Sequence, residues 1–258
     1  MKLITNESQR TRSSLHAKLT RLGVKVAEED IITPALAMAS IIRERGLTPH
    51  LLVHPNVVAD LGEVQPGKQP DCVVLGDAAQ GFNYDNLNKA FRVLASQPSA
   101  PLFSLGKGKF YREDGQLDLD VGAFAAALEF AGERAAEVCG KPGVPFFKEG
   151  LKALGLAAEE VVMVGDDVVS DVGGAQKAGV RGVLVRTGKY RQASSSGLKS
   201  AFDFLPISGL RWTSPITRSS QTKLWTTSPP LSTSFFPKTN GPFWKLQILY
   251  LSDALTSK

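Results

Sequence analysis

Short apolar runs alternate with longer amphipathic stretches from the start of the chain to about residue 185. Uninterrupted short apolar runs have the length and composition of buried strands, whereas apolar residues spaced three or four apart predict helices. Strands are expected at residues 1–4, 50–54, 71–76, 101–105, 136–139, 161–164 and 181–185, and helices at residues 8–22, 31–45, 55–61, 84–95, 122–131, 145–154 and 172–179. This alternation predicts an α/β fold with a mostly parallel sheet covered by helices.

Turn residues set several limits within this pattern. Pro34 is tolerated in the first turn of the helix expected over residues 31–45, and Gly46 marks its end. The dipeptide Asp114-Gly115 lies at the centre of residues 110–119 and predicts a β-hairpin there.

Carboxylates directly follow the apolar run over residues 161–164, in the sequence VVMVGDDVVSD. Gly165 permits a sharp turn before Asp166 and Asp167, and Asp171 follows five residues after Asp166. Ligands of open α/β sheets bind beyond the carboxyl ends of the strands, where carboxylates favour a hard cation such as Mg2+. The alternative is ordinary turn chemistry, with Asp171 capping a helix.

Two further polar motifs follow expected strands. Thr5-Asn6 comes after the first apolar run, and Lys141 lies in the sequence GKP after the run over residues 136–139. A hydroxyl, a lysine and an acidic pair at one edge of a parallel sheet are suited to phosphoryl transfer, because they can bind phosphate, neutralise its charge and hold Mg2+. Taken singly, Thr5 is also compatible with a helix cap and Lys141 with a solvated surface position.

The composition, 43% hydrophobic and 21% charged, fits a globular protein. The chain has no apolar run of about 18 residues and its start lacks an apolar core, so we expect neither a transmembrane helix nor a signal peptide. Cys72 and Cys139 lie in apolar runs without CxxC spacing, which predicts buried thiols in a reducing compartment.

The chain changes character near Arg191. Residues 192–258 carry 7 basic and 2 acidic residues and all three tryptophans, while the preceding residues are electrically balanced. Enrichment in Ser, Thr and Pro without a period predicts a disordered tail of low solubility. An interaction with nucleic acid or a membrane surface is less favoured, because the basic residues are scattered. The stretch PFWKLQILYL, residues 242–251, is expected to form a short helix or strand.

The segments TNESQ, SLGKGK, GKPG, VGDDVVSDVGGAQKAG and RTGKYR together resemble the haloacid dehalogenase-type hydrolases, in the branch with a large cap between the Thr and Lys motifs. The resemblance covers roughly residues 3–191 and implies a Rossmann-like parallel-sheet core with an inserted α/β cap domain. The implied domains are core residues 1–30, cap residues 31–131, core residues 132–191 and a tail over residues 192–258.

The resemblance also implies roles for single residues. Thr5 and Asn6 match the motif that binds phosphate, and Lys141 matches the lysine that stabilises phosphate and nucleophile. Thr5 and Lys141 are thus the catalytic candidates, and together with Asn6 they are the substrate-binding candidates. Asp166 matches the acidic ligand of Mg2+, and Asp171 matches a second acid that helps hold the metal.

The implied activity is Mg2+-dependent hydrolysis of the P–N bonds of phospholysine and phosphohistidine, and of inorganic pyrophosphate. The implied partners are a phosphorylated small molecule or a phospho-Lys or phospho-His protein, and a second copy of the chain bound through the cap, with no specific nucleic acid and no membrane. The implied location is the cytoplasm, with the nucleus as a second site.

The family places an aspartate nucleophile on a strand some tens of residues before the Thr motif, whereas Thr5 here lies four residues after Met1. We therefore expect the nucleophile and the first core strand to be absent, and activity to be impaired. A non-catalytic, cap-containing fragment that acts as a binding module is the alternative. A response-regulator-like domain is disfavoured, because its motif order differs and it carries no cap.

Overall fold

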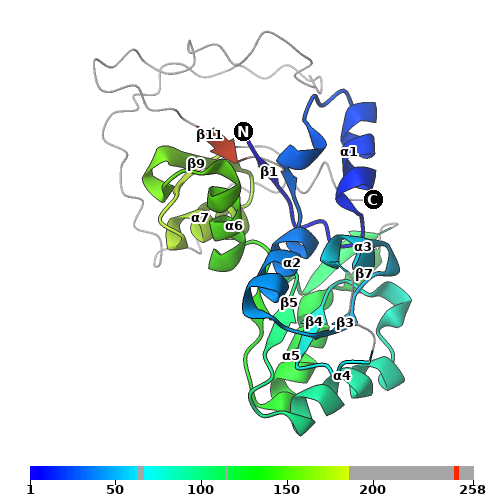
Figure 1. Cartoon of the computed structure of the whole chain (residues 1–258). Helices are drawn as coiled ribbons and strands as arrows, with labels where there is room; N and C mark the ends of the chain where they lie inside the picture. Colours follow the sequence, from blue (N-terminus) through cyan, green and yellow to red (C-terminus); the bar gives the residue numbers. More distant parts are fainter. Residues whose placement is uncertain (63–66, 114–115, 186–246, 250–258) are drawn as a thin grey trace, which may run out of the picture. The chain divides into compact units, whose positions relative to one another are not determined.

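The computed structural model describes residues 1–62, 67–113, 116–185 and 247–249. Within these residues the expected α/β fold is confirmed, with parallel sheets and covering helices (Figure 1). The largest sheet has the order β3-β4-β5-β8, and all its strands are parallel. Its strands are β3 (Pro49–Leu52), β4 (Cys72–Leu75), β5 (Leu102–Ser104) and β8 (Glu137–Val138).

The remaining strands form smaller sheets. The expected hairpin is confirmed as the antiparallel pair β6 (Phe110–Glu113) and β7 (Gln116–Leu119). β1 (Leu3–Ile4) pairs in parallel with β2 (Ile31–Ile32). A third parallel sheet has the order β10-β9-β11, formed by β10 (Arg181–Leu184), β9 (Val161–Gly165) and β11 (Gln247–Leu249). β11 confirms the expectation of a short element within residues 242–251.

The helices pack on both faces of the four-stranded sheet and beside the smaller sheets. The α-helices are α1 (Arg12–Arg21), α2 (Pro34–Arg45), α3 (Val58–Leu61), α4 (Tyr84–Ser96), α5 (Val121–Gly132), α6 (Val144–Leu154) and α7 (Gly174–Lys177). Shorter turns are η1 (Glu28–Asp30), η2 (Pro55–Val57), η3 (Ala79–Gly81), η4 (Ala158–Glu160) and the π-helix η5 (Val168–Gly173). None of the helices in the described part of the chain is long and apolar enough to cross a bilayer.

Alternate residues of β4 point into two separate cores. Val74 packs with Met38 of α2 and Phe103 of β5, whereas Val73 packs with Leu94 of α4 and with α5. The period of two along a strand therefore builds a layer of helix on each face of the sheet. Both cysteines are buried in the α2 core, as expected, and burial raises the pKa of each thiol to about 12.

The expected start of the helix over residues 31–45 is wrong. Ile31 and Ile32 form β2 instead, because pairing with β1 buries both side chains, which are β-branched and favour strands. The helix begins after Thr33, whose hydroxyl accepts a hydrogen bond from the Leu36 N–H at 3.4 Å. Its end at Gly46 is confirmed, with φ +64 in the left-handed region.

Two other helix limits also differ from expectation. The first helix begins at Arg12 and not at residue 8, because Thr11 caps it by accepting from the Ser14 N–H at 3.2 Å. The helix expected over residues 172–179 begins as the π-helix η5 at Val168. Asp167 caps η5, and this side chain was not expected to start a helix.

Strand pairing crosses the domain limits that the sequence predicts. β2, expected in the cap, pairs with β1, and β8, expected in the core, pairs with β5. Arg45 of α2 also makes two hydrogen bonds to Glu137 of β8, at 2.8 and 2.7 Å. The limits themselves stay a prediction, and residues 192–241 of the expected tail lie outside the described residues.

Candidate active site

Asn6 connects the loop after β1 to the loop after β8, 135 residues later in the chain. Its Nδ2 donates to the Lys141 carbonyl at 2.9 Å, and its Oδ1 accepts from the Lys141 N–H at 2.7 Å. Gly140 fits beneath this contact, because a Cβ there would lie 2.3 Å from the Leu105 carbonyl oxygen. The Asn6 side chain thus holds the backbone of Lys141 through both its N–H and its carbonyl group.

Thr5 lies directly before Asn6 and is fully buried. Its N–H donates to the Ile32 carbonyl at 3.2 Å, and its Oγ1 accepts from the Glu7 N–H at 3.1 Å. The hydroxyl therefore shapes the turn after β1, whereas the cap of the first helix is Thr11. The interpretation of Thr5 as a helix cap is wrong.

Lys141 is buried, with 1% of its surface exposed, so a solvated surface position is also wrong. Its Nζ lies 2.8 Å from Asp171 Oδ1 in an ion pair whose side chains are 0% and 2% exposed. A buried ammonium group requires such a compensating charge, because leaving water is costly. The structure thereby brings the lysine and the second acid of the predicted set together.

Asp171 also organises the acidic loop after β9. Its Oδ2 accepts hydrogen bonds from the N–H groups of Asp166 at 3.1 Å and Asp167 at 3.0 Å. Gly165 permits this approach, because a Cβ there would lie only 2.3 Å from Asp171 Oδ2. Asp167 accepts from the N–H groups of Val169 and Ser170, so Asp167 and not Asp171 caps the following helix.

The donor set fits a hard divalent cation in part. Asp166 is a buried carboxylate, 1% exposed, at the carboxyl end of β9, and oxygen is the donor that Mg2+ prefers. Asp171 already accepts from Lys141 and two backbone amides, so its geometry suits support of the site. No group of three or more metal-binding side chains occurs among the described residues. Water and phosphate oxygens would therefore supply most ligands, as is usual for Mg2+.

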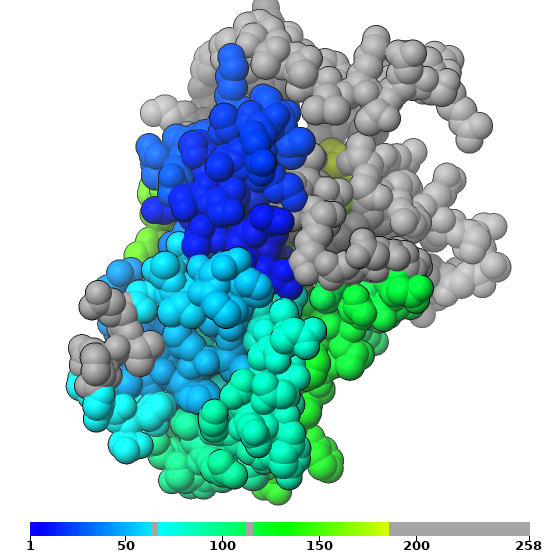
Figure 2. Space-filling view, turned by 90° about the vertical axis from the view of Figure 1, so that its right-hand side faces the viewer, coloured from blue at the N-terminus to red at the C-terminus, as the bar shows by residue number. Residues whose placement is uncertain are grey.

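Two contacts of the segment that follows Asn6 involve residues that the sequence analysis did not select. Gln9 Nε2 donates to Asp77 Oδ2 in the loop after β4, and the Arg12 N–H donates to Asp60 Oδ2 at 2.7 Å. In Figure 2 the blue N-terminal residues accordingly border the cyan residues of this region. The sequence signal for Asp77 was available, since it follows a buried strand and Gly76, as Asp166 follows β9 and Gly165.

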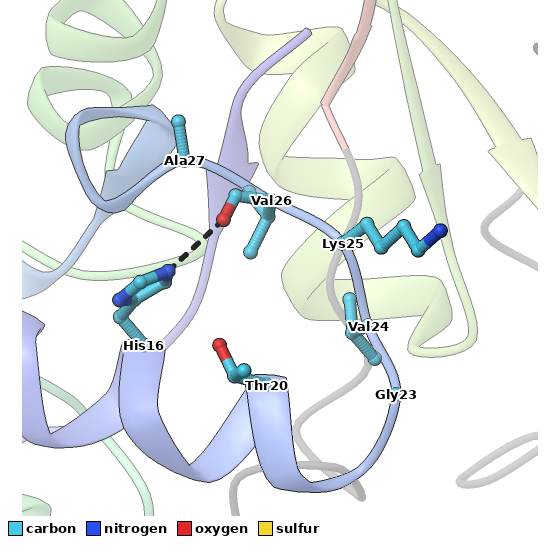
Figure 3. A pocket seen from close by; sticks show the side chains of 7 residues that line it. All are labelled: His16, Thr20, Gly23, Val24, Lys25, Val26 and Ala27. Atoms are coloured by element: carbon cyan, nitrogen blue, oxygen red, sulfur yellow. Dashed lines mark hydrogen bonds between the residues drawn. The ribbon is translucent and has the colours of Figure 1, made fainter.

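A hollow of about 640 Å3 lies apart from these residues, beside the C-terminal half of α1 (Figure 3). His16 and Thr20 point toward it, His16 donates from Nε2 to the Val26 carbonyl at 3.1 Å, and Lys25 points away. None of the selected site residues lines it. The hollow is open and supplies no buried polar group for phosphate, whereas Lys141 and Asp166 are both buried.

Comparisons with known proteins identify the family. The family described as "Haloacid dehalogenase-like hydrolase" matches residues 1–65, and the family described as "HAD-hyrolase-like" matches residues 138–206. The phospholysine phosphohistidine inorganic pyrophosphate phosphatase of Xenopus laevis is 48% identical over 191 residues, which are 74% of this chain and 70% of that protein. The human protein of the same name is 46% identical over the same shares.

A solved structure supports the fold. The 4-nitrophenylphosphatase of Thermotoga maritima aligns with a TM-score of 0.66 at 26% identity, covering 74% of each chain. The same family is indicated by the parallel sheets, by the motifs at their carboxyl ends and by relatives of almost 50% identity. The chain belongs to the haloacid dehalogenase-like hydrolases, a family whose matching members here are named phosphatases.

Proposed function

We propose that the site formed by Asn6, Lys141, Asp166 and Asp171 binds a phosphoryl group together with Mg2+. The observation that carries the proposal is the continuous hydrogen-bonded chain from Asn6 through Lys141 and Asp171 to the Asp166 loop. Lys141 would offer positive charge to phosphate, and Thr5 and Asn6 would shape the loop that receives it. Mg2+ held by Asp166 would neutralise further phosphate charge.

The substrate class follows from the relatives and is also a proposal. We propose the P–N bonds of phospholysine and phosphohistidine and the P–O–P bond of pyrophosphate, because the names of relatives at 46–49% identity specify these. A phosphorylated small molecule or a phosphorylated protein would be the partner. A cytoplasmic location, with the nucleus as a second one, is compatible with the buried free thiols.

We propose slow turnover by the site as described. Family resemblance assigns attack on phosphorus to an aspartate, whereas it assigns Asp166 and Asp171 to the metal and Thr5, Asn6 and Lys141 to phosphate. Loss of a covalent nucleophile costs on the order of a million-fold in rate in a protease example. The second candidate is therefore a binding module that takes up phosphate without turnover, favoured by the same assignment of roles.

One experiment separates these candidates. Phosphate release from pyrophosphate would be measured with and without Mg2+, beside calorimetry with inorganic phosphate and with Mg2+ alone. We expect phosphate binding that Lys141→Met abolishes, a Mg2+ dissociation constant on the order of millimolar, and very slow release. Asp118→Asn, on the exposed strand β7, is the control. Robust release that Asp166→Asn abolishes would contradict impairment, and absence of phosphate binding would contradict the site.

A homodimer through the cap is a separate proposal. Phe110, Leu117 and Leu119 of the β6–β7 hairpin are 60%, 59% and 64% exposed, which is unusual for neighbouring large apolar side chains. Burying them against a second copy would remove apolar area from water. Sedimentation of the chain against Leu117→Glu would test it, and an unchanged monomer in both cases would contradict it.

A further inference from the structure

One edge of β9 carries a segment from much later in the chain. β11 pairs with β9 in parallel, with Gln247 opposite Val161 and Ile248 opposite Val162. β10 occupies the other edge, and Figure 1 shows β11, in red, beside β9. We propose that this edge of β9 is an acceptor site for an extended strand, and that the chain's own segment Gln247–Leu249 fills it within the same molecule.

The backbone of β9 shows which groups this strand would satisfy. The Gly165 carbonyl accepts from the Val185 N–H, beyond β10, at 2.8 Å. Successive residues of a strand direct their N–H and C=O groups to opposite neighbours, so Met163 also faces β10, whereas Val162 faces β11. Val162 is only 6% exposed, and buried backbone groups without a partner are costly. The acceptor edge therefore requires an occupant.

The sequence of the occupant fits the interior of a parallel sheet. Residues 248–251 (ILYL) are the longest uninterrupted apolar run within residues 192–258. Strands covered on both faces read as continuous apolar runs, whereas half-exposed strands alternate. Residues 186–246 supply the dozen or more residues that a connection between parallel strands needs. No second copy is required to fill the edge.

The acceptor edge lies directly before the acidic loop. β9 ends at Gly165, and the next N–H, that of Asp166, is bonded to Asp171. β11 holds the first three residues of β9, while β10 is aligned with its last four. β11 would thus fix the half of β9 that lies farther from Asp166. The acidic loop would then follow a strand that is paired on both edges.

Paired cysteines in the full chain test this placement. Residues directly opposite on neighbouring strands place their side chains on the same face within disulfide range, and a shift of one residue moves a side chain to the other face. Val162→Cys with Ile248→Cys should form an intrachain disulfide under mild oxidation. Val162→Cys with Leu249→Cys is the matched control and should not. The natural thiols stay inert, because burial raises the pKa of each to about 12.

Hydrogen exchange gives a second measurement. Leu249→Pro removes the N–H that this register directs to the Val162 carbonyl, which should detach β11. The Val162 N–H should then exchange at least ten-fold faster, while that of Met163, which faces β10, changes less. Leu249→Val keeps the donor and should leave both unchanged. The Val74 amide in the four-stranded sheet reports whether the molecule stays folded.

The outcomes are distinct. A disulfide in the 162/248 pair alone, with selective exposure of Val162, supports the proposal. Equal crosslinking of both pairs, no crosslink in the 162/248 pair, or a crosslink between two chains overturns it, as does unchanged exchange of Val162. If Leu249→Pro also exposed Val74, the variant would have unfolded and the cysteine pairs would decide. None of these readouts depends on phosphate binding or turnover.

Discussion

Lys141 and Asp171 form an ion pair that is almost completely removed from solvent, with 2.8 Å between Nζ and Oδ1. Removing one partner of a buried pair leaves an uncompensated charge, which typically costs about 3–5 kcal/mol. We expect Lys141→Met to lower the free energy of unfolding by about that amount, measured by urea denaturation. Lys152 pairs with Glu44 on the surface, so Lys152→Met is the matched control and should change little.

A double variant separates the pair from its surroundings. Lys141→Met combined with Asp171→Asn removes both charges and keeps an oxygen that can accept from the Asp166 N–H. The double variant should lose less stability than the sum of the two single variants, by about 0.5–3 kcal/mol. Strictly additive losses would show that the pair is not energetically coupled.

Asp60 gives a pH-dependent prediction at the same scale. Burial raises its pKa above the ordinary value of 3.8, although the hydrogen bond from the Arg12 N–H opposes the shift. A raised folded-state pKa means that this carboxyl contributes stability at low pH and loses it as pH rises through the folded value. The melting temperature of the natural chain, relative to Asp60→Asn, should therefore fall as the pH rises from below the ordinary value of 3.8 toward neutral. A difference that does not vary with pH would contradict this.

At the scale of elements, a hydrogen bond between two side chains joins the loop after β1 to the loop after β4. Gln9 donates to Asp77 Oδ2, and the Ala79 N–H donates to Asp77 Oδ1 at 3.0 Å. Asp77→Ala removes the acceptor of both bonds, so the side-chain amide of Gln9 and the backbone N–H of Ala79 should exchange faster by several-fold. Asp77→Asn keeps one acceptor and should restore part of the protection.

A nearby cap provides the control for that comparison. Asn83 accepts from the Asn86 N–H at 3.0 Å at the start of α4. Asn83→Ala should affect the first turn of α4 and leave the Gln9 amide unchanged. If both variants exposed Gln9 equally, the loop after β1 would be sensitive to any loss in this region, and the direct link would be refuted.

The four-stranded sheet has a core on each face and is built from one continuous part of the chain, which predicts independent folding at the scale of the molecule. Limited proteolysis of the whole protein should leave a resistant fragment near residues 31–131. Because β8 pairs with β5, a fragment extended to residue 139 should melt at a higher temperature. Uniform digestion of this region would show that it needs the rest of the molecule.

Local patterns predicted most elements and selected the candidate site residues, whose roles stay a prediction. The end of α2 at Gly46, the hairpin around Asp114-Gly115 and the acids after β9 could be predicted. Each of these signals depends only on residues that are neighbours in sequence. The contacts among the site residues were not accessible in this way. Asn6 and Lys141 are 135 positions apart, and no periodicity encodes a hydrogen bond between them.

The sequence by itself determined the α/β class, the order of the elements and the chemistry available at the carboxyl ends of the strands. Only the tertiary structure decided that Ile31 and Ile32 are a strand, that Lys141 is buried against Asp171, and that Gln247–Leu249 lies on β9. The physical reason is the same in each case. Apolar residues and turns act over a few positions, whereas strand pairing and ion pairing depend on which distant segments share a buried edge.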